Sequence, residues 1–385
     1  MGKNALWTIS NQWRTGSSDK GQKTRKMTGS WKSTSREFLK SHLPIPVAAR
    51  LRLRSHRKVY QPSTNPARER NYITAQQDYV AKRIFVRSLP FFAGMDSCNF
   101  CNLRCWFCHA NNGEYSISNP KVPKVHNRER CCLDLEKYAL VLEAFGETLF
   151  SINLTSWAEP FLNRNIFTMV SMAKKRNIEV RFSTNPNIKD PGLAQKICEC
   201  ELDALGLSID GLRQETYEKY RRGGNFEVLI QNLRKIAAYK KKYRPKKPEL
   251  IWKFLVFRHN EHEIPFVEEF AHSHGADSVR ISGADIYHEG WIPGSKEYPP
   301  LGPRFENICN YLWTTATIEA TGSLSPCCTN RDYRYDLGEF TTAQKLRELW
   351  NGDRIRALRN YCYDRKPNSK IVCDMCLLMK HDVKR

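Results

Sequence analysis

The sequence predicts an α/β protein built around a partial TIM-like barrel. From residue 91 onward, short apolar stretches alternate with amphipathic stretches at helical spacing. Strands that are regularly separated by helices form βα units and a parallel sheet, and six such units suit a partial barrel. The six strands are expected at residues 91–96, 150–155, 178–183, 204–209, 250–256 and 278–282.

The helices between these strands are predicted from apolar periodicity. In the clearest case, residues 133–147, the side chains of Leu135, Ala139, Leu142 and Phe145 recur at a spacing that places them on one helical face. Such a stripe indicates a helix that packs against the sheet. Further helices are expected at residues 226–239 and 262–273.

Charge divides the chain into regions. The net charge is +22, yet residues 1–90 contain 19 Lys and Arg against 4 Asp and Glu, a net +15 that leaves +7 for the rest. Residues 1–42 are basic and lack apolar periodicity, which predicts a disordered arm. This arm could contact nucleic acid, but a solvated tail is the commoner outcome and the one we favour. Residues 43–90 are expected to be a lead-in that packs on the barrel, which spans 91–290, and a C-terminal domain is expected over 300–385.

Composition indicates a soluble protein of a reducing compartment. No apolar run is long enough to span a membrane, and the N-terminus lacks the continuous apolar segment of a secretion signal. Fourteen cysteines, several of them in C-x-x-C pairs, favour metal ligation over a disulfide framework. We therefore expect a cytoplasmic protein.

Three cysteines stand close together after the first predicted strand. Cys101, Cys105 and Cys108 have the spacing C-x3-C-x2-C. Thiolates are soft ligands that suit iron–sulfur clusters, and three of them can hold three irons of a [4Fe-4S] cluster while the fourth stays open. Cys105 to His109 also reads C-x-x-C-H, the pattern of covalent haem attachment. Cys98 and Cys101 form a further C-x-x-C, as in a four-cysteine zinc or ferredoxin-like site.

Polar motifs follow the next three predicted strands. They are Ser156-Trp157-Ala158-Glu159-Pro160, Ser183-Thr184-Asn185 and Ser208-Ile209-Asp210-Gly211. A single motif of this kind is usually a turn. Together with the cysteine loop after the first strand, however, they make four polar loops in succession, which are difficult to explain as turns. In barrels of this type, chemistry gathers at the carboxyl ends of the strands. We therefore expect these loops to form one site.

The cysteine loop, the aromatic Phe107 before its last cysteine and the strand-end motifs together resemble the radical S-adenosylmethionine (SAM) superfamily. The resemblance implies a six-strand barrel in which Cys101, Cys105 and Cys108 ligate a [4Fe-4S] cluster. It also implies that SAM chelates the open iron through its amino and carboxylate groups. A reduced flavodoxin- or ferredoxin-like protein would supply the electron that cleaves SAM to a 5′-deoxyadenosyl radical.

The same resemblance assigns residues to a SAM pocket. The superfamily's Gly-Glu-Pro motif corresponds to Ala158-Glu159-Pro160, and Glu159 is expected to receive the SAM amino group. Ala158 adds a β-carbon, which is tolerated unless that backbone needs a positive φ. The other expected contacts are Thr184 and Asn185 lining the pocket, Ser208 and Asp210 facing the carboxylate and ribose, and Arg221 pairing with the carboxylate. An Arg fork matches a carboxylate bidentately, whereas the alternative for Arg221 is a solvated helix residue.

The C-terminal region contains a second set of cysteines at spacings C-x17-C and C-x2-C, namely Cys309, Cys327, Cys373 and Cys376. Their order resembles the SPASM/twitch extension of radical SAM enzymes. The number of cysteines fits the shorter twitch form, which holds one auxiliary [4Fe-4S] cluster. Cys328 is an alternative to Cys327, Cys362 is a less favoured substitute, and a structural zinc at the same four cysteines is the competing interpretation.

The resemblance implies a radical SAM oxidoreductase that abstracts hydrogen from its substrate, with a net oxidation if the second cluster accepts the electron. Residues 1–42 lack the periodicity of a compact peptide-binding module. This favours a small hydroxylated or amino-sugar-like substrate. The first alternative is a maturase of a ribosomally made peptide. An alternative from another class is a non-catalytic iron–sulfur or nucleic-acid-binding protein that uses the basic arm.

Overall fold

The computed structural model describes residues 65–108, 110, 129–243, 246–300, 309–330, 332–364 and 372–375. The predicted arm, the first part of the lead-in segment, His109 and Cys376 lie outside the described residues.

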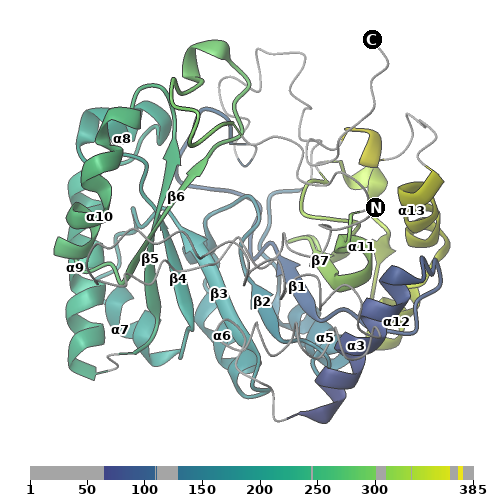
Figure 1. Ribbon diagram of the computed structural model, residues 1–385. Coiled ribbons are helices and arrows are strands. Elements are labelled where there is room, and N and C mark those ends of the chain that lie inside the picture. Colours follow the sequence, from purple (N-terminus) through teal and green to yellow (C-terminus); the bar gives the residue numbers. More distant parts are fainter. Residues whose placement is uncertain are drawn as a thin grey trace, which may run out of the picture.

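Six parallel strands form the centre of the molecule, in the order β6-β5-β4-β3-β2-β1 (Figure 1). They are β1 (Phe92–Met95), β2 (Ser151–Asn153), β3 (Glu179–Thr184), β4 (Ala204–Ser208), β5 (Glu249–Val256) and β6 (Ser278–Gly283). Each lies within its predicted range or extends one residue beyond it. The sheet remains open at β6, so the predicted partial barrel of βα units is confirmed.

The C-terminal strands extend this sheet. β7 (Thr315–Ile318) pairs with β1 in parallel, and β8 (Ser323–Ser325) and β9 (Gly338–Glu339) follow as antiparallel neighbours. Gly322 adopts a φ of +83° in the turn between β7 and β8, a conformation that glycine adopts without steric cost. The C-terminal region is therefore joined to the barrel by backbone hydrogen bonds.

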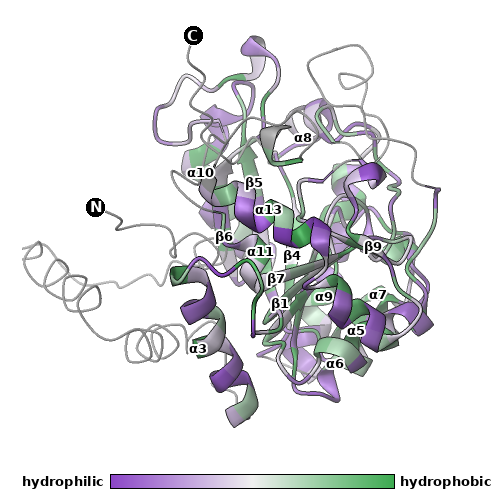
Figure 2. Ribbon diagram, turned by 90° about the vertical axis from the view of Figure 1, so that its right-hand side faces the viewer, coloured by the Kyte–Doolittle hydropathy of each residue, from purple (hydrophilic) through white to green (hydrophobic). Residues whose placement is uncertain are grey.

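Most of the described helices lie along one face of the sheet (Figure 1). The helices are α3 (Pro66–Val80), α5 (Leu135–Phe145), α6 (Ile166–Lys174), α7 (Leu193–Glu199), α8 (Gln214–Tyr220), α9 (Phe226–Tyr243), α10 (Ile264–Ser273), α11 (Tyr311–Thr314), α12 (Ala343–Leu349) and α13 (Asp353–Asp364). Short 3-10 helices lie at Pro160–Leu162, Glu261–Glu263, Glu289–Trp291, Tyr333–Tyr335 and Val372–Met375. Hydrophilic and hydrophobic segments alternate along α3, α5 and α13 (Figure 2). Within the described ranges, no helix combines the length and apolar character needed to cross a membrane.

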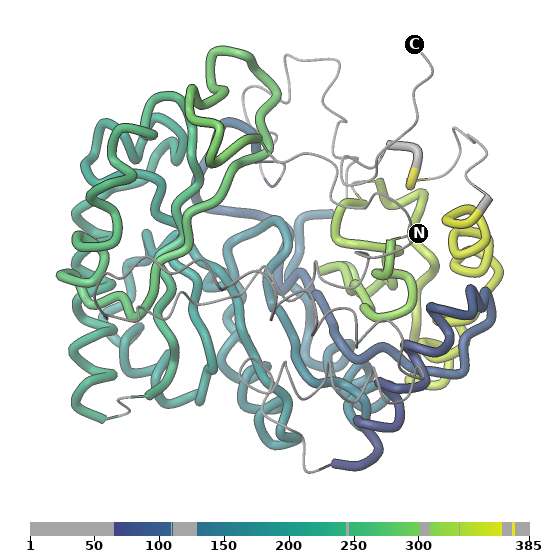
Figure 3. Tube along the Cα trace, in the orientation of Figure 1, coloured from purple at the N-terminus to yellow at the C-terminus, as the bar shows by residue number. Residues whose placement is uncertain are grey.

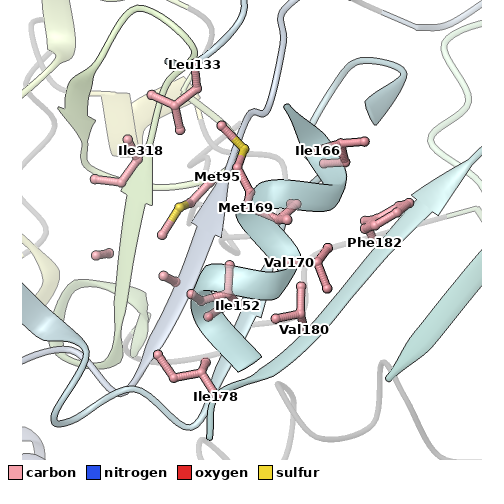
Figure 4. Close-up of a cluster of buried hydrophobic side chains, with 14 of the residues drawn as sticks. Met95, Leu133, Ile152, Ile166, Met169, Val170, Ile178, Val180, Phe182 and Ile318 are labelled. Atoms are coloured by element: carbon pink, nitrogen blue, oxygen red, sulfur yellow. The ribbon is translucent and has the colours of Figure 1, made fainter. Parts of the chain in front are cut away.

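The core lies between the sheet and the helices. Figure 4 shows α6 packed over the strands, with Met169 and Val170 beside Ile152, Val180 and Phe182. All five side chains are fully buried. Burying a side chain of this size contributes on the order of 1.5–3 kcal/mol. Side chains alternate between the two faces of a strand. The strand residues that alternate with these core residues therefore point to the opposite, concave face of the sheet.

The segment that joins α3 to β1 is held by the C-terminal helices, and Figure 3 traces both. Arg359 on α13 is fully buried and donates hydrogen bonds to the carbonyls of Ile84, Leu312 and Trp350 at 2.9 Å each. Trp350 donates its indole N–H to the Ser88 carbonyl at 3.0 Å. These bonds connect distant parts of the chain and fix the entry into β1.

Candidate functional site

The cysteine loop follows β1 at the carboxyl edge of the sheet. Its apolar residues Leu103 and Phe107 are buried and anchor it against Tyr220 and Phe257. The backbone N–H of Trp106 donates to the Tyr220 carbonyl at 3.2 Å. The fold thus fixes the path of the loop through the residues between the cysteines.

The three thiols of the loop lie close enough to influence one another. Burial raises the pKa of Cys101 to about 11, with added repulsion from Glu159 and Cys108. Burial raises the pKa of Cys105 to about 12, repulsion from Cys108 and Cys101 adds to this, and the positive charge of Arg221 opposes it. Such thiols are neutral by themselves, so deprotonation requires a bound cation beside them.

This donor set fits an iron–sulfur cluster in its chemistry. It offers three soft sulfurs on one anchored loop, and Arg221 Nη1 lies 3.7 Å from Cys105 Sγ. A guanidinium at this position offsets the negative charge that three thiolates would bring. Within the described ranges, no three His, Cys, Asp or Glu side chains stand at metal-ligand distances from a common point.

Cys98 has a different environment from the other cysteines of the loop. Its thiol donates to the Glu159 carbonyl at 3.0 Å, and its backbone forms an isolated antiparallel bridge with Cys132. Burial raises the pKa of the Cys98 thiol most, and the neighbouring sulfur that adds to this shift is that of Cys132. These contacts give no support to the alternative of a four-cysteine site that includes Cys98.

Glu159 is held in a fixed orientation beside the loop. Its carboxylate accepts from the Thr184 hydroxyl at 2.7 Å, the Asn185 N–H at 2.8 Å and the Phe161 N–H at 3.2 Å. The side chain is 1% exposed, and burial raises its pKa to about 7 although these hydrogen bonds oppose the shift. The preceding Ala158 is not among the described non-glycine residues with positive φ, so a β-carbon is accommodated there.

Asn185 connects this carboxylate to the cysteine loop. Its side-chain amide donates to Asn102 Oδ1 at 2.9 Å and lies 3.4 Å from Cys101 Sγ. The structure therefore brings together three of the predicted SAM-pocket residues, Glu159, Thr184 and Asn185, with one of the predicted ligands.

Arg221 and Asp210 form a buried ion pair on the other side of the loop. Arg221 Nε lies 2.5 Å from Asp210 Oδ2, and Asp210 Oδ1 accepts from the Leu255 N–H at 2.7 Å. Arg221 is therefore not a solvated helix residue. Asp210 orients Arg221 through one oxygen of its carboxylate. Ser208 ends β4, in register with Lys253 of β5.

The sequence reasoning missed an aromatic cluster beside the cysteines. The ring of Trp291 lies 5.2 Å from that of Phe107 and 5.6 Å from that of Trp106, and the rings of Tyr220 and Phe257 are 4.4 Å apart. Aromatic rings at these separations pack favourably edge-to-face or offset. These rings come from the cysteine loop, the end of α8 and the segments after β5 and β6, and no periodicity could have linked them in advance.

Three of the C-terminal cysteines, Cys309, Cys327 and Cys328, lie near Tyr311 of α11. Cys328 raises the pKa of the Tyr311 hydroxyl most strongly, partly through a hydrogen bond, and burial, Cys309 and Cys327 add to the shift. The Cys327 sulfur lies 3.1 Å from Thr329 Oγ1. Cys373 lies in the 3-10 helix Val372–Met375 and packs against the main core. Cys362 is buried on α13.

Comparison with known families matches residues 95–256 to the radical SAM superfamily and residues 309–377 to the SPASM iron–sulfur cluster-binding domain. The chain belongs to the radical SAM superfamily and carries a C-terminal SPASM region. Membership implies a [4Fe-4S] cluster that binds SAM, an auxiliary iron–sulfur cluster and SAM itself.

Relatives of several activities are similar to the chain. It is 22% identical over 310 residues to the mycofactocin maturase MftC of Mycobacterium ulcerans, covering 72% of this chain and 77% of the relative. It is 28% identical over 136 residues to an Fe-coproporphyrin III synthase of Methanosarcina barkeri, covering 34% and 30%. A probable GTP 3′,8-cyclase of Methanocaldococcus jannaschii is 25% identical over 178 residues, covering 46% and 54%. The chain therefore spans 30% and 54% of the last two relatives.

Among solved structures, SuiB of Streptococcus suis bound to its precursor peptide SuiA is similar, with a TM-score of 0.53 and 14% identity. The similarity covers 81% of this chain and 74% of SuiB. At this identity the match establishes the fold, which agrees with the open parallel sheet described above.

Proposed function

We propose that the protein cleaves SAM reductively to a 5′-deoxyadenosyl radical and abstracts a hydrogen atom from a substrate. The [4Fe-4S] cluster would supply the electron, held by Cys101, Cys105 and Cys108. The observation that carries this proposal is that the buried Glu159 and the largely buried Arg221, groups of opposite charge, lie beside this one cysteine loop. SAM presents the complementary pair, an ammonium and a carboxylate.

Each charged group would bind one end of the amino acid part of SAM. Glu159, held by Thr184 and Asn185, would accept the ammonium. Arg221, oriented by Asp210, would pair with the carboxylate. Charge-assisted hydrogen bonds contribute roughly 1.5–3 kcal/mol each, so either group should change SAM affinity by roughly one to two decades.

The proposed net reaction is an oxidation. Its support is a second group of cysteines in the SPASM region, whose β7 pairs with β1 in the same sheet. The proposed ligands of the auxiliary cluster there are Cys309, Cys327, Cys373 and Cys376. The proposal includes a reduced flavodoxin- or ferredoxin-like electron donor. It also includes the cytoplasm, because cluster thiolates persist in a reducing compartment.

For the substrate we propose a small hydroxylated or amino-sugar-like molecule. The second candidate is a ribosomally made peptide, which is favoured by the similarity to the maturase MftC over 72% of this chain. The two candidates differ in what stimulates SAM cleavage. A polyol or amino sugar should raise the rate of 5′-deoxyadenosine formation in one case, and a precursor peptide in the other.

The proposed activity is tested with the full chain after anaerobic reconstitution with iron and sulfide. Incubation with SAM and dithionite should give 5′-deoxyadenosine, measured by liquid chromatography. Cys105→Ala should abolish the product, whereas Cys198→Ala, which removes a buried thiol on α7, should not. Absence of 5′-deoxyadenosine from the reconstituted wild type would instead favour a non-catalytic iron–sulfur protein.

A further inference from the structure

Three residues on neighbouring strands point to the concave face of the sheet. Gly94 of β1 is in register with Asn153 of β2 on one side and with Thr317 of β7 on the other. Their chain neighbours Met95, Ile152 and Ile318 belong to the apolar core on the helix side (Figure 4). Because side chains alternate along a strand, Asn153 and Thr317 flank Gly94 on the opposite face.

Both flanking side chains carry a buried polar atom for which the described residues offer no hydrogen-bond partner. Asn153 donates its amide N–H to the Thr155 carbonyl at 2.9 Å, which fixes the orientation of the amide and leaves Oδ1 as the second atom. In the described chain, neither Asn153 Oδ1 nor Thr317 Oγ1 has a partner, and Thr317 is only 3% exposed. Buried polar atoms in native proteins are nearly always hydrogen-bonded, so these two atoms point to a ligand.

The space above Gly94 is open. No atom lies within 4 Å of the position that a β-carbon of Gly94 would occupy, as far as the described residues go. Gly206, on the same face of β4, differs: a β-carbon there would meet Ser183 Oγ at 2.8 Å and Lys253 Cδ at 2.9 Å. The concave face is therefore filled at β4 and open at β1.

We propose that Asn153 and Thr317 bind hydroxyl groups of the substrate, which lies over Gly94. The inference rests on the proposed function and specifies its substrate class. Asn153 Oδ1 can only accept a hydrogen bond, whereas the Thr317 hydroxyl can donate or accept. Adjacent strands are about 4.8 Å apart, so the two Cα atoms lie roughly 10 Å apart and the side chains can reach two hydroxyls of one small molecule.

Charge on the same row favours a hydroxyl over an ammonium. Arg181 of β3 is in register with Asn153, and its guanidinium forms an ion pair with Glu179. Lys253 of β5 lies farther along the same face. Glu179 offsets part of the Arg181 charge, and the remainder would repel an ammonium of the substrate at Asn153 but not a neutral hydroxyl.

The subsite lies next to the proposed SAM site. Asn153 ends β2, and the loop that carries Glu159 follows it. Gly94 precedes the cysteine loop on β1, and Thr317 belongs to the region matched by the SPASM domain. A polyol in this position would lie at the carboxyl edge of the sheet, where a carbon bearing a hydroxyl can face the SAM-binding loops.

The test uses the full-length, reconstituted protein with SAM bound, and myo-inositol and D-glucosamine as probes in saturation-transfer NMR. We expect myo-inositol to bind with a Kd on the order of 1 mM, and Thr317→Val to weaken binding by about 10-fold, the effect of one hydrogen bond. The matched control is Thr315→Val, on the same strand and face, since the Thr315 hydroxyl already pairs with Thr314 Oγ1 at 3.1 Å. Thr317→Val should leave the thermal midpoint unchanged or raised, because it removes a buried hydroxyl that no described residue pairs with.

Several outcomes would overturn the subsite. The first is that myo-inositol fails to bind, which would leave the space to water alone. The second is equal affinity for myo-inositol in Thr317→Val and Thr315→Val. The third is binding of D-glucosamine alone. Formation of 5′-deoxyadenosine without a probe is measured in the same samples. If the wild type forms it and the probe result is negative, only the subsite is wrong. If no 5′-deoxyadenosine forms, the proposed function fails independently of the probe result.

Discussion

The cysteines that follow β1 lie beside charged groups, whereas the described contacts of Cys327 and Cys328 are with hydroxyls. Arg221 lies 3.7 Å from Cys105, and Glu159 is near enough to Cys101 to raise the pKa of its thiol. Glu159 is buried and Arg221 is largely buried, and hydrogen bonds with Thr184, Asn185 and Asp210 orient them. They can therefore bind an external molecule that carries both signs of charge.

The second group of cysteines contacts neutral hydroxyls. Thr329 Oγ1 lies 3.1 Å from the Cys327 sulfur, and Tyr311 forms a hydrogen bond with Cys328. Hydroxyls at this distance can orient and polarise a thiolate. This comparison is consistent with the proposal that the first region binds SAM and that the second holds an auxiliary cluster.

Removing the first set of cysteines should have the largest effect. The wild type should contain about eight irons per chain after reconstitution, and the triple Cys101/Cys105/Cys108→Ala variant about four, because each ligand set holds one four-iron cluster. The triple variant should form no 5′-deoxyadenosine. Iron analysis and product chromatography check both points. Zinc in the C-terminal site, or covalently bound haem, would contradict the assignment.

Removing the second set should separate iron content from SAM cleavage. Cys327→Ala is expected to halve the iron to about four per chain while 5′-deoxyadenosine still forms, because the first cluster remains. Cys328→Ala is the matched control and should retain about eight irons. The opposite pattern would show that Cys328 is the ligand.

Glu159→Gln should weaken SAM binding and leave the iron content intact. The loss of one charge-assisted hydrogen bond in a buried site predicts roughly a 10- to 100-fold higher Kd, measured by equilibrium dialysis. Glu263→Gln is a matched control, since Glu263 is also a buried carboxylate and accepts from Thr216 at 2.7 Å, away from the cysteine loop. Equal SAM affinity in the two variants would remove Glu159 from the site.

The smallest predicted effect concerns Lys253, whose positive charge near the first cysteine region should lower the free energy of unfolding. Burial, with Arg280 and Arg221 nearby, lowers the pKa of Lys253 to about 8. The unfolded chain then binds the proton more tightly between about pH 8 and 10.5, so wild-type stability should rise with pH across this window. Lys253→Met should be more stable than the wild type at pH 7 by roughly 1–3 kcal/mol, with a smaller gap at pH 10. Urea unfolding at both pH values measures the gap, and a constant gap would contradict the pKa shift.

Much of the fold could be predicted because its signals are local. The alternation of Val180 and Phe182 with polar neighbours defines β3, and the stripe through Leu142 and Phe145 defines α5. The pairing of β7 with β1 could not be predicted, since it joins Phe92 to Thr315 across more than half of the chain without a local pattern.

The proximity of the candidate site residues was predicted to a similar extent. The spacing of the cysteines and the strand-end motifs selected these residues, and the structure brings Glu159 and Asn185 to the cysteine loop, while their roles stay predictions. The expectation that Asp210 faces SAM did not foresee its ion pair with Arg221, which depends on the position of α8 relative to β4. The atoms of Asn153 and Thr317 were also not foreseen, because hydrogen-bond satisfaction is visible only in three dimensions.

The central claim, that only the first cysteine region presents an open iron to SAM, is tested most directly by electron paramagnetic resonance. The dithionite-reduced Cys327→Ala variant retains the first cluster, and the Cys101/Cys105/Cys108→Ala variant retains the second. We predict that SAM shifts the g values of the reduced cluster in Cys327→Ala and leaves the spectrum of the triple variant unchanged. A SAM-dependent shift in the triple variant, or none in Cys327→Ala, would contradict the account.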